Sequence, residues 1–314
     1  MCVEARWKGR IVDDVLTTQD DAFSSFHPVL TFFYFLAIIG CSMFVMHPAV
    51  LTASLVGGVS YSWYLTRGAS QRGLLAMMLS AMVLPALINP LFNHAGATVL
   101  FRLWWGAPVT FEAVAFGLCT GCMLASVVVW FACYRMVMTS DKTIYLFGKA
   151  VPALSLVFSM TLQFVPRFMT QFKRVLNAQR CMGRDVIHGT LRERTSTAAK
   201  TISIMATWAL EGSIQTADSM RSRGYGLRGR TSYSPYRFDL RDRMAAAVVL
   251  VLVGLITYGL WSGGLEISFF PMINAAAPCV SSAAACGAFA VLCMFPLIVD
   301  GADEVRWRYL RSKI

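Results

Sequence analysis

The chain has 314 residues, of which 56% are apolar and only 14% are charged, and its formal net charge at pH 7 is +11. Soluble domains carry roughly a quarter charged residues, so this composition excludes an ordinary water-soluble globular protein and favours one that lies in a membrane. Acidic residues such as Glu4 and Asp13 precede the first apolar run. A secretory signal peptide is therefore not expected, and the first apolar run should remain as a helix.

Long stretches without any Asp, Glu, Lys or Arg indicate the membrane-spanning segments, because about 20 apolar residues are enough to cross a bilayer as a helix. There are five such stretches: Pro28–Thr66, Gly73–Phe101, Ala113–Tyr134, Met244–Leu265 and Ile267–Val299. The first contains Pro48, which favours a break, and it is long enough for two helices. The sequence therefore predicts an all-α integral membrane protein with about six transmembrane helices.

The distribution of Lys and Arg predicts the orientation of these spans, because short basic loops stay in the cytoplasm. Basic residues occur before the first span, after the second, after the fourth and after the sixth: Arg6, Lys8, Arg10, Arg67, Arg72, Arg135, Lys142, Arg306, Arg308, Arg311 and Lys313. We therefore expect a multi-pass protein with both termini cytoplasmic. The uncharged segment 150–166 is short and holds prolines near both ends, so it is expected to lie in the interface or to re-enter partly.

These patterns divide the chain into four parts. Residues 1–27 form a cytoplasmic N-terminal segment, and residues 28–149 hold four transmembrane helices with their loops. Residues 150–243 contain the interfacial segment and a cytoplasmic module, and residues 244–314 hold two transmembrane helices and a basic tail.

The positive charge is concentrated in residues 167–243, which hold 15 of the 28 Lys and Arg residues but only 6 of the 17 acids, a net +9. Apolar residues recur there at helical spacing and predict two long amphipathic helices. One face consists of Phe168, Phe172, Val175, Leu176 and Gln179, and the other of Ile202, Met205, Ala209, Ala217 and Met220. The first helix should end near Gly183 and the second at Gly224, because glycine readily adopts the left-handed conformation that ends helices.

Such a basic module has two main interpretations. A polybasic surface attracted to anionic lipid is one of them. Arginines outnumber lysines by 13 to 2 in this region, however, and arginine favours defined contacts with carboxylates. The basic residues also gather at the ends of the two helices, so a docking surface for a partner protein is preferred. Binding of nucleic acid is disfavoured because no recognition motif is present.

Catalysis finds little support in the sequence. No phosphate-binding loop of the type GxxxxGK[ST] occurs, so the chain is not expected to hydrolyse ATP. Four scattered histidines show no metal-binding spacing, and the spans lack paired carboxylates, which leaves only Asp300 for an ion-driven carrier. Asn89, Pro90, Asn93 and His94 at the end of the third span are better explained by a capped and kinked helix end than by a substrate site.

Several motifs in the middle of the chain resemble the T component of energy-coupling-factor (ECF) transporters, the EcfT/CbiQ-like family. They lie in order between about residues 85 and 235: NPLFNH (89–94), DKTIYLFG (141–148), LQFVPRF with Pro166 and Arg167 (162–168), AQRCMGRD (178–185), ADSMRSRGYG (217–226) and RTSY (230–233). The rest of the chain matches this family only in character. In that family, two cytoplasmic coupling helices each end in a small residue, arginine and glycine, which dock on one of two ATPase subunits.

The resemblance implies which residues of this chain make those contacts. The second motif is intact as Ser222, Arg223 and Gly224, whereas the first reads Cys181, Met182 and Gly183, with methionine where arginine is usual. Arg180 and Arg184 flank the first motif and are candidates for the missing charge. Such asymmetry fits two different ATPases better than two identical ones.

The resemblance also implies the function and the partners. The chain is expected to be a non-catalytic subunit of an importer for vitamins or transition metal ions in a prokaryotic cell membrane. It would bind two ABC-type ATPase subunits and a membrane-embedded substrate-binding S subunit, and it would contact the lipid bilayer but no nucleic acid. No cofactor or metal is expected on this chain, since ATP and Mg belong to the partner subunits. A lipid-binding membrane scaffold and an ion-driven secondary carrier are the alternatives.

Overall fold

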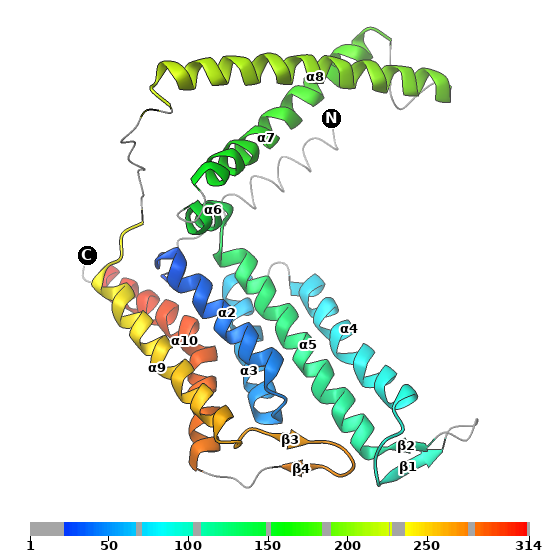
Figure 1. Ribbon diagram of the computed structural model, residues 1–314, viewed down its shortest axis with the longest axis vertical. Helices are drawn as coiled ribbons and strands as arrows, with labels where there is room; N and C mark the ends of the chain where they lie inside the picture. The colour runs from blue at the N-terminus through cyan, green and yellow to red at the C-terminus, as the bar shows by residue number, and fades with distance from the viewer. Residues whose placement is uncertain are drawn as a thin grey trace. The chain divides into compact units, whose positions relative to one another are not determined.

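The computed structural model describes residues 22–66, 71–102, 108–148, 152–183, 190–225, 227, 236–275 and 280–312. The chain divides into two compact units (Figure 1). The first unit comprises Met1–Lys142 and Tyr236–Ile314, and the second unit comprises Thr143–Pro235. The second unit is therefore an insertion between two parts of the first.

Helices make up most of the first unit. They are α2 (Pro28–Phe44), α3 (Pro48–Thr66), α4 (Gln71–Phe92), α5 (Phe111–Val137), α9 (Leu240–Trp261) and α10 (Val280–Arg311), while α6 (Ser140–Gly148) leads into the second unit. Two short antiparallel ladders, which the sequence did not predict, pair β1 (Val99–Arg102) with β2 (Pro108–Thr110) and β3 (Ile267–Ser268) with β4 (Asn274–Ala275).

Four helices in the described part of the chain are long and apolar enough to cross a membrane: Arg72–Phe92, Phe111–Val137, Leu240–Trp261 and Val280–Arg311. These helices make the chain a multi-pass membrane protein. The remaining two expected spans correspond to α2, which is apolar but has only 17 residues, and to α3. The break expected at Pro48 is confirmed, because α2 ends at Phe44 and α3 begins at Pro48.

Helix α3 lies at the centre of the first unit, between α5 and α10. A side chain on Gly57 would come within 2.7 Å of the Cys293 Cβ atom of α10, and one on Gly58 within 3.0 Å of Val129 of α5. Small residues thus let the helices approach closely, as is usual between membrane helices. Helix α3 has a lower hydropathy than the four helices that are candidates for crossing the membrane. Its central position explains this difference, since protein covers much of its surface.

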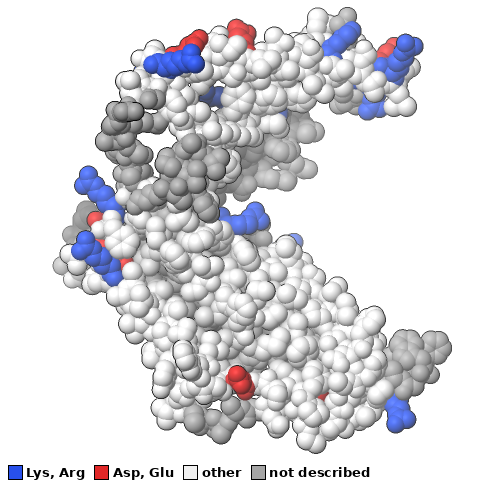
Figure 2. Space-filling view, viewed as in Figure 1, with Lys and Arg blue, Asp and Glu red and all other residues white. Residues whose placement is uncertain are grey.

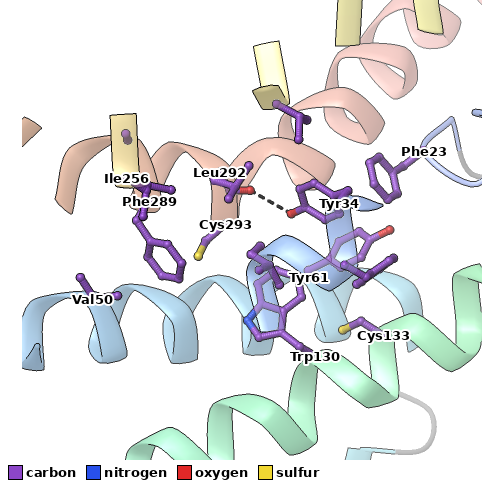
Figure 3. Close-up of a cluster of buried hydrophobic side chains, with 14 of the residues drawn as sticks. Phe23, Tyr34, Val50, Tyr61, Trp130, Cys133, Ile256, Phe289, Leu292 and Cys293 are labelled. Carbon is purple, nitrogen blue, oxygen red and sulfur yellow. Dashed lines mark hydrogen bonds between the residues drawn. The ribbon is translucent and has the colours of Figure 1, made fainter. Parts of the chain in front are cut away.

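The core of the first unit surrounds this central helix (Figure 3). The Trp130 side chain of α5 is fully buried, and its Nε1 atom donates a hydrogen bond of 3.0 Å to the Ser54 hydroxyl of α3. Tyr34 of α2 donates from its hydroxyl to the Leu292 carbonyl oxygen of α10, at 2.9 Å. The Trp130 N–H and the Tyr34 O–H therefore both find hydrogen-bond acceptors inside the bundle.

The second unit contains two long helices, α7 (Pro152–Cys181) and α8 (Leu191–Ser222). The uncharged segment 152–166 and the first amphipathic helix form one continuous helix, which passes through Pro166. Met205 is buried as expected, but Ile202, placed by the sequence on the same face, is 66% exposed. The buried residues of α8 follow a spacing of four residues, Thr197, Thr201 and Met205, and Ile202 lies beside this row.

The orientation of the spans can be tested by thiol labelling. We expect a cysteine introduced at Asn274, in the loop between the last two helices, to react with a membrane-impermeant reagent applied from outside. A cysteine at Ser234, which lies outside the described residues, should react only after the membrane is permeabilised. The parent protein for both would have its reactive native cysteines replaced. External labelling at Ser234 without labelling at Asn274 would reverse the orientation.

Candidate functional site: the ends of the two long helices

Helices α7 and α8 cross and contact each other through aromatic side chains (Figure 1). The Trp208 ring of α8 lies 5.7 Å from the Phe164 ring and 6.2 Å from the Phe168 ring of α7, measured between centroids. Such ring pairs contribute beyond their buried area, by about 0.5–1.5 kcal/mol. The aromatic contact therefore stabilises the packing of α7 against α8.

The first turn of α8 is fixed by a capping box. The Thr190 backbone N–H donates to the Glu193 carboxylate at 3.0 Å, while the Thr190 side chain accepts from the N–H of residue 193. The backbone N–H of Thr190, followed by its side chain, lowers the pKa of Glu193. This reciprocal pairing satisfies two of the free N–H groups at the start of the helix, those of Thr190 and Glu193.

The last turn of α8 forms a complete Schellman motif, in which Arg223 is the capping residue. The Gly224 N–H donates to the Arg221 carbonyl oxygen, and the Tyr225 N–H donates to the Met220 carbonyl oxygen, both at 3.0 Å. Gly224 has a φ of +77°, which only glycine adopts at little cost. Ser222 and Arg223 are exposed. The helix thus ends as the sequence predicted and leaves Ser222 and Arg223 on the surface.

The end of α7 is built in a similar way. The Gly183 N–H donates to the Arg180 carbonyl oxygen at 2.9 Å, and Gly183 has a φ of +76°. Cys181 and Met182 are exposed, the latter to 61%, so the degenerate motif offers an apolar tip. Arg180 is exposed as well, whereas Arg184 lies outside the described residues. Both tips therefore share a glycine-terminated backbone but differ in charge.

The length of α8 determines how far apart its capped ends lie. Its 32 residues span about 48 Å at 1.5 Å per residue. Figure 2 shows charged side chains gathered towards the two ends of this helix.

Two grooves flank the crossing within the second unit. One is apolar, with a volume of about 570 Å³, and is lined by residues that include Phe164, Phe168, Ala217 and Met220. The other, of about 510 Å³, is more polar and is lined by Arg167, Glu211 and Arg223 among others. Arg167 and Arg223, which the sequence placed in different motifs, thus line the same groove.

Residues 89–98 belong to the first unit and form a compact helix end. The Asn89 amide donates to the Ala113 carbonyl oxygen of α5 at 2.6 Å, and Pro90 lies in the last turn of α4. Beyond this turn, the Asn93 side chain accepts from the Ala95 N–H at 3.1 Å, which turns the chain past the exposed His94. These contacts support the structural interpretation of the motif over a substrate site.

The sequence did not single out Glu112, which completes this helix end. Glu112 is 4% exposed and accepts hydrogen bonds from the Thr98 hydroxyl at 2.7 Å and from the Thr98 N–H. Gly96, with a φ of +146°, has Glu112 and Thr110 so close that a side chain would clash. A carboxylate at the first turn of an apolar helix was the only available signal, since acids favour helix N-termini.

Comparison with known proteins adds to this geometry. No protein-family model matches the chain. Over 116 residues, 37% of this chain and 42% of the relative, it is 34% identical to the energy-coupling factor transporter transmembrane protein EcfT of Lactobacillus helveticus. It is also 34% identical over 107 residues to EcfT of Lacticaseibacillus paracasei and 29% identical over 122 residues to EcfT of Streptococcus thermophilus. Over this part of its length, the chain is similar to ECF transporter T components.

The aligned part is limited. The chain covers 40% of the Lacticaseibacillus paracasei relative and 46% of the Streptococcus thermophilus relative. Less than half of each of these EcfT proteins is matched, so the similarity covers only part of their length.

Proposed function

We propose that this chain is the transmembrane coupling (T) subunit of an ECF-type importer for vitamins or transition metal ions. In this role it transmits ATP-driven motion of two ATPase subunits to a substrate-binding S subunit. The observation that carries the proposal is the pair of exposed, glycine-capped ends on α7 and α8. Similarity to EcfT proteins supports it independently.

The two tips are proposed to dock on the two ATPases. Ser222, Arg223 and Gly224 make the charged contact, and Cys181, Met182 and Gly183 make a mainly apolar one, with Arg180 and Arg184 beside it. Such unlike tips suit a heterodimer of ATPases. The shape of the α4 end is maintained by Asn89, Pro90, Asn93 and His94. Pro166 and Arg167 belong to α7, which acts together with α8 as the lever that transmits this motion.

The chain itself is proposed to be non-catalytic and to bind no cofactor, with ATP and Mg on the partner subunits. Its proposed place is the prokaryotic cell membrane, with six spans, both termini cytoplasmic, and the module of residues 150–243 on the cytoplasmic side. An ion-driven carrier is disfavoured, because Asp300 is 2% exposed and accepts the Phe23 N–H at 2.7 Å. A lipid-binding scaffold does not require capped helix ends with unlike tips.

Co-purification tests the proposal. Affinity-tagged protein solubilised gently from native membranes is expected to retain two polypeptides that carry phosphate-binding loops, together with one small membrane protein, identified by mass spectrometry. ATP hydrolysis by the eluate should depend on those polypeptides, and the isolated chain should hydrolyse none. Recovery of the tagged chain without any ATPase, from membranes in which it is properly inserted, would exclude the T-subunit function.

A further inference from the structure

The six residues Ala22–His27, called here the anchor segment, precede α2 and contact several distant parts of the first unit. Phe23, Phe26 and His27 in this segment are all buried. Several of its contacts lie close to the two places where the chain passes between the units. These places are directly after Lys142 and directly before Tyr236. This coincidence suggests a mechanical role.

The entry to the second unit is held by Lys142 of α6. Lys142 is 8% exposed, and its ammonium group donates to the Ser24 carbonyl oxygen at 2.6 Å and to the Val137 carbonyl oxygen at 3.0 Å. Val137 is the last residue of α5, where a cation is favoured by the helix dipole. Lys142 therefore joins the end of α5 to the anchor segment.

The exit from the second unit is held by the residues that lead into α9. Asp242 accepts the His27 N–H at 3.3 Å and the Asp239 N–H at 3.1 Å. The Phe238 ring lies 5.0 Å from the His27 ring. Arg241 stacks over the Phe26 ring at 4.6 Å and donates to the Ala22 carbonyl oxygen at 3.4 Å.

The anchor segment is in turn tied to the membrane helices. Asp300 of α10 accepts the Phe23 N–H, and the Phe23 ring packs against Tyr34 and Phe35 of α2 at centroid distances of 5.1 and 6.1 Å. It also meets Tyr61 of α3 at 6.2 Å. A displacement of this segment would therefore act on α2, α3 and α10 together.

We infer that the anchor segment is the joint through which movement of the second unit reaches the membrane helices, with Lys142 and Asp242 as positioning residues. The inference rests on the proposed function, because the movement is the one driven by the ATPases. Lys142, directly before the second unit in the chain, and Asp242, a few residues after it, contact the same six residues. Neither residue contacts a partner or a substrate in this role.

The test uses Lys142→Met, which keeps the length of the side chain but removes the charge, in the assembled complex reconstituted into proteoliposomes. Substrate uptake per ATP hydrolysed should fall roughly tenfold, the factor that loss of a hydrogen bond from a charged group produces. ATPase retention and ATP hydrolysis should stay near wild type. Lys200→Met, which removes an exposed lysine of α8, is the matched control and should leave the ratio unchanged.

Hydrogen exchange of the isolated chain in detergent provides a second measurement that does not depend on transport. Peptides covering residues 22–27 should exchange faster in Lys142→Met, whereas peptides of α3 and α10 should not. If Lys142→Met fails to accumulate in the membrane, Asp242→Asn takes its place, with the same two expectations. An asparagine keeps only one acceptor oxygen, so it cannot serve both His27 and Asp239.

The possible results distinguish a failure of the proposed joint from a failure of the proposed function. Normal uptake per ATP in Lys142→Met or Asp242→Asn would overturn the joint. A proportional fall of assembly, hydrolysis and uptake would overturn it too, because it would indicate a purely structural role. Failure of the wild-type chain to bind any ATPase would instead contradict the proposed function, and the exchange result would remain interpretable.

Discussion

Arg223→Glu is expected to abolish coupled uptake and to release an ATPase subunit from the complex. Arg223 is the exposed C-capping residue of α8, and the hydrogen bonds of the Schellman motif fix its backbone. The guanidinium group therefore extends from a well-defined backbone position. In a carboxylate-lined groove, the loss of one partner of a buried pair costs about 3–5 kcal/mol, and a reversed charge adds repulsion. The measurements are uptake by the reconstituted complex and ATPase retention on the tagged chain.

Met182→Ala is the matched variant at the other tip. It removes an apolar contact, which is worth about 2–3 kcal/mol at most when fully buried in the complex, so uptake should fall less than in Arg223→Glu. A polybasic lipid surface predicts a different pattern, in which Arg228→Glu and Arg230→Glu are as harmful as Arg223→Glu. Normal transport with both ATPases bound to Arg223→Glu would contradict the docking role of this tip.

Trp130→Ala is expected to destabilise the first unit by about 3–5 kcal/mol, the usual cost of truncating a fully buried tryptophan. The indole fills the space between α2, α3 and α5: its ring centroid lies 6.3 Å from that of Phe35 and 6.5 Å from that of Tyr61. The change would also leave Ser54 without the Nε1–H donor. Thermal unfolding of the purified chain in detergent, followed by thiol accessibility of the buried Cys133, would measure the loss.

Trp261→Ala provides the control for this variant. Trp261 is the last residue of α9 and is 93% exposed in the isolated chain, so its truncation removes little packing within the protein. Its effect on the free energy of unfolding should be within about 0.5 kcal/mol, as for other exposed positions. Equal destabilisation by the two variants would mean that the core is not centred on Trp130.

Local signals in the sequence were enough to predict the membrane character and the ends of the long helices. Charge-free runs reveal spans because a charge in the bilayer is costly. Pro48, Gly183 and Gly224 mark breaks because their backbone preferences act within one turn of helix, whatever lies nearby. The capped tips therefore followed from the sequence together with the family resemblance.

Periodicity alone could not decide which side of a helix packs. Met205 and Ile202 have similar apolarity and lie three residues apart, but only Met205 is buried. The direction from which another segment packs is not contained in the spacing of apolar residues. The same limit applies to α3, whose serines and glycines lower its hydropathy. Its central position is what makes those residues suitable for close packing.

The anchor segment depended entirely on tertiary structure. Its partners Lys142, Asp242 and Asp300 are separated from it by 118, 215 and 277 positions in their respective hydrogen bonds. Nothing in the local sequence of any of them indicates these contacts, since each reads as an ordinary charge at the end of an apolar run. Sequence patterns report preferences within a few residues, whereas a buried charge is stabilised by whichever distant backbone groups the fold brings within about 3 Å.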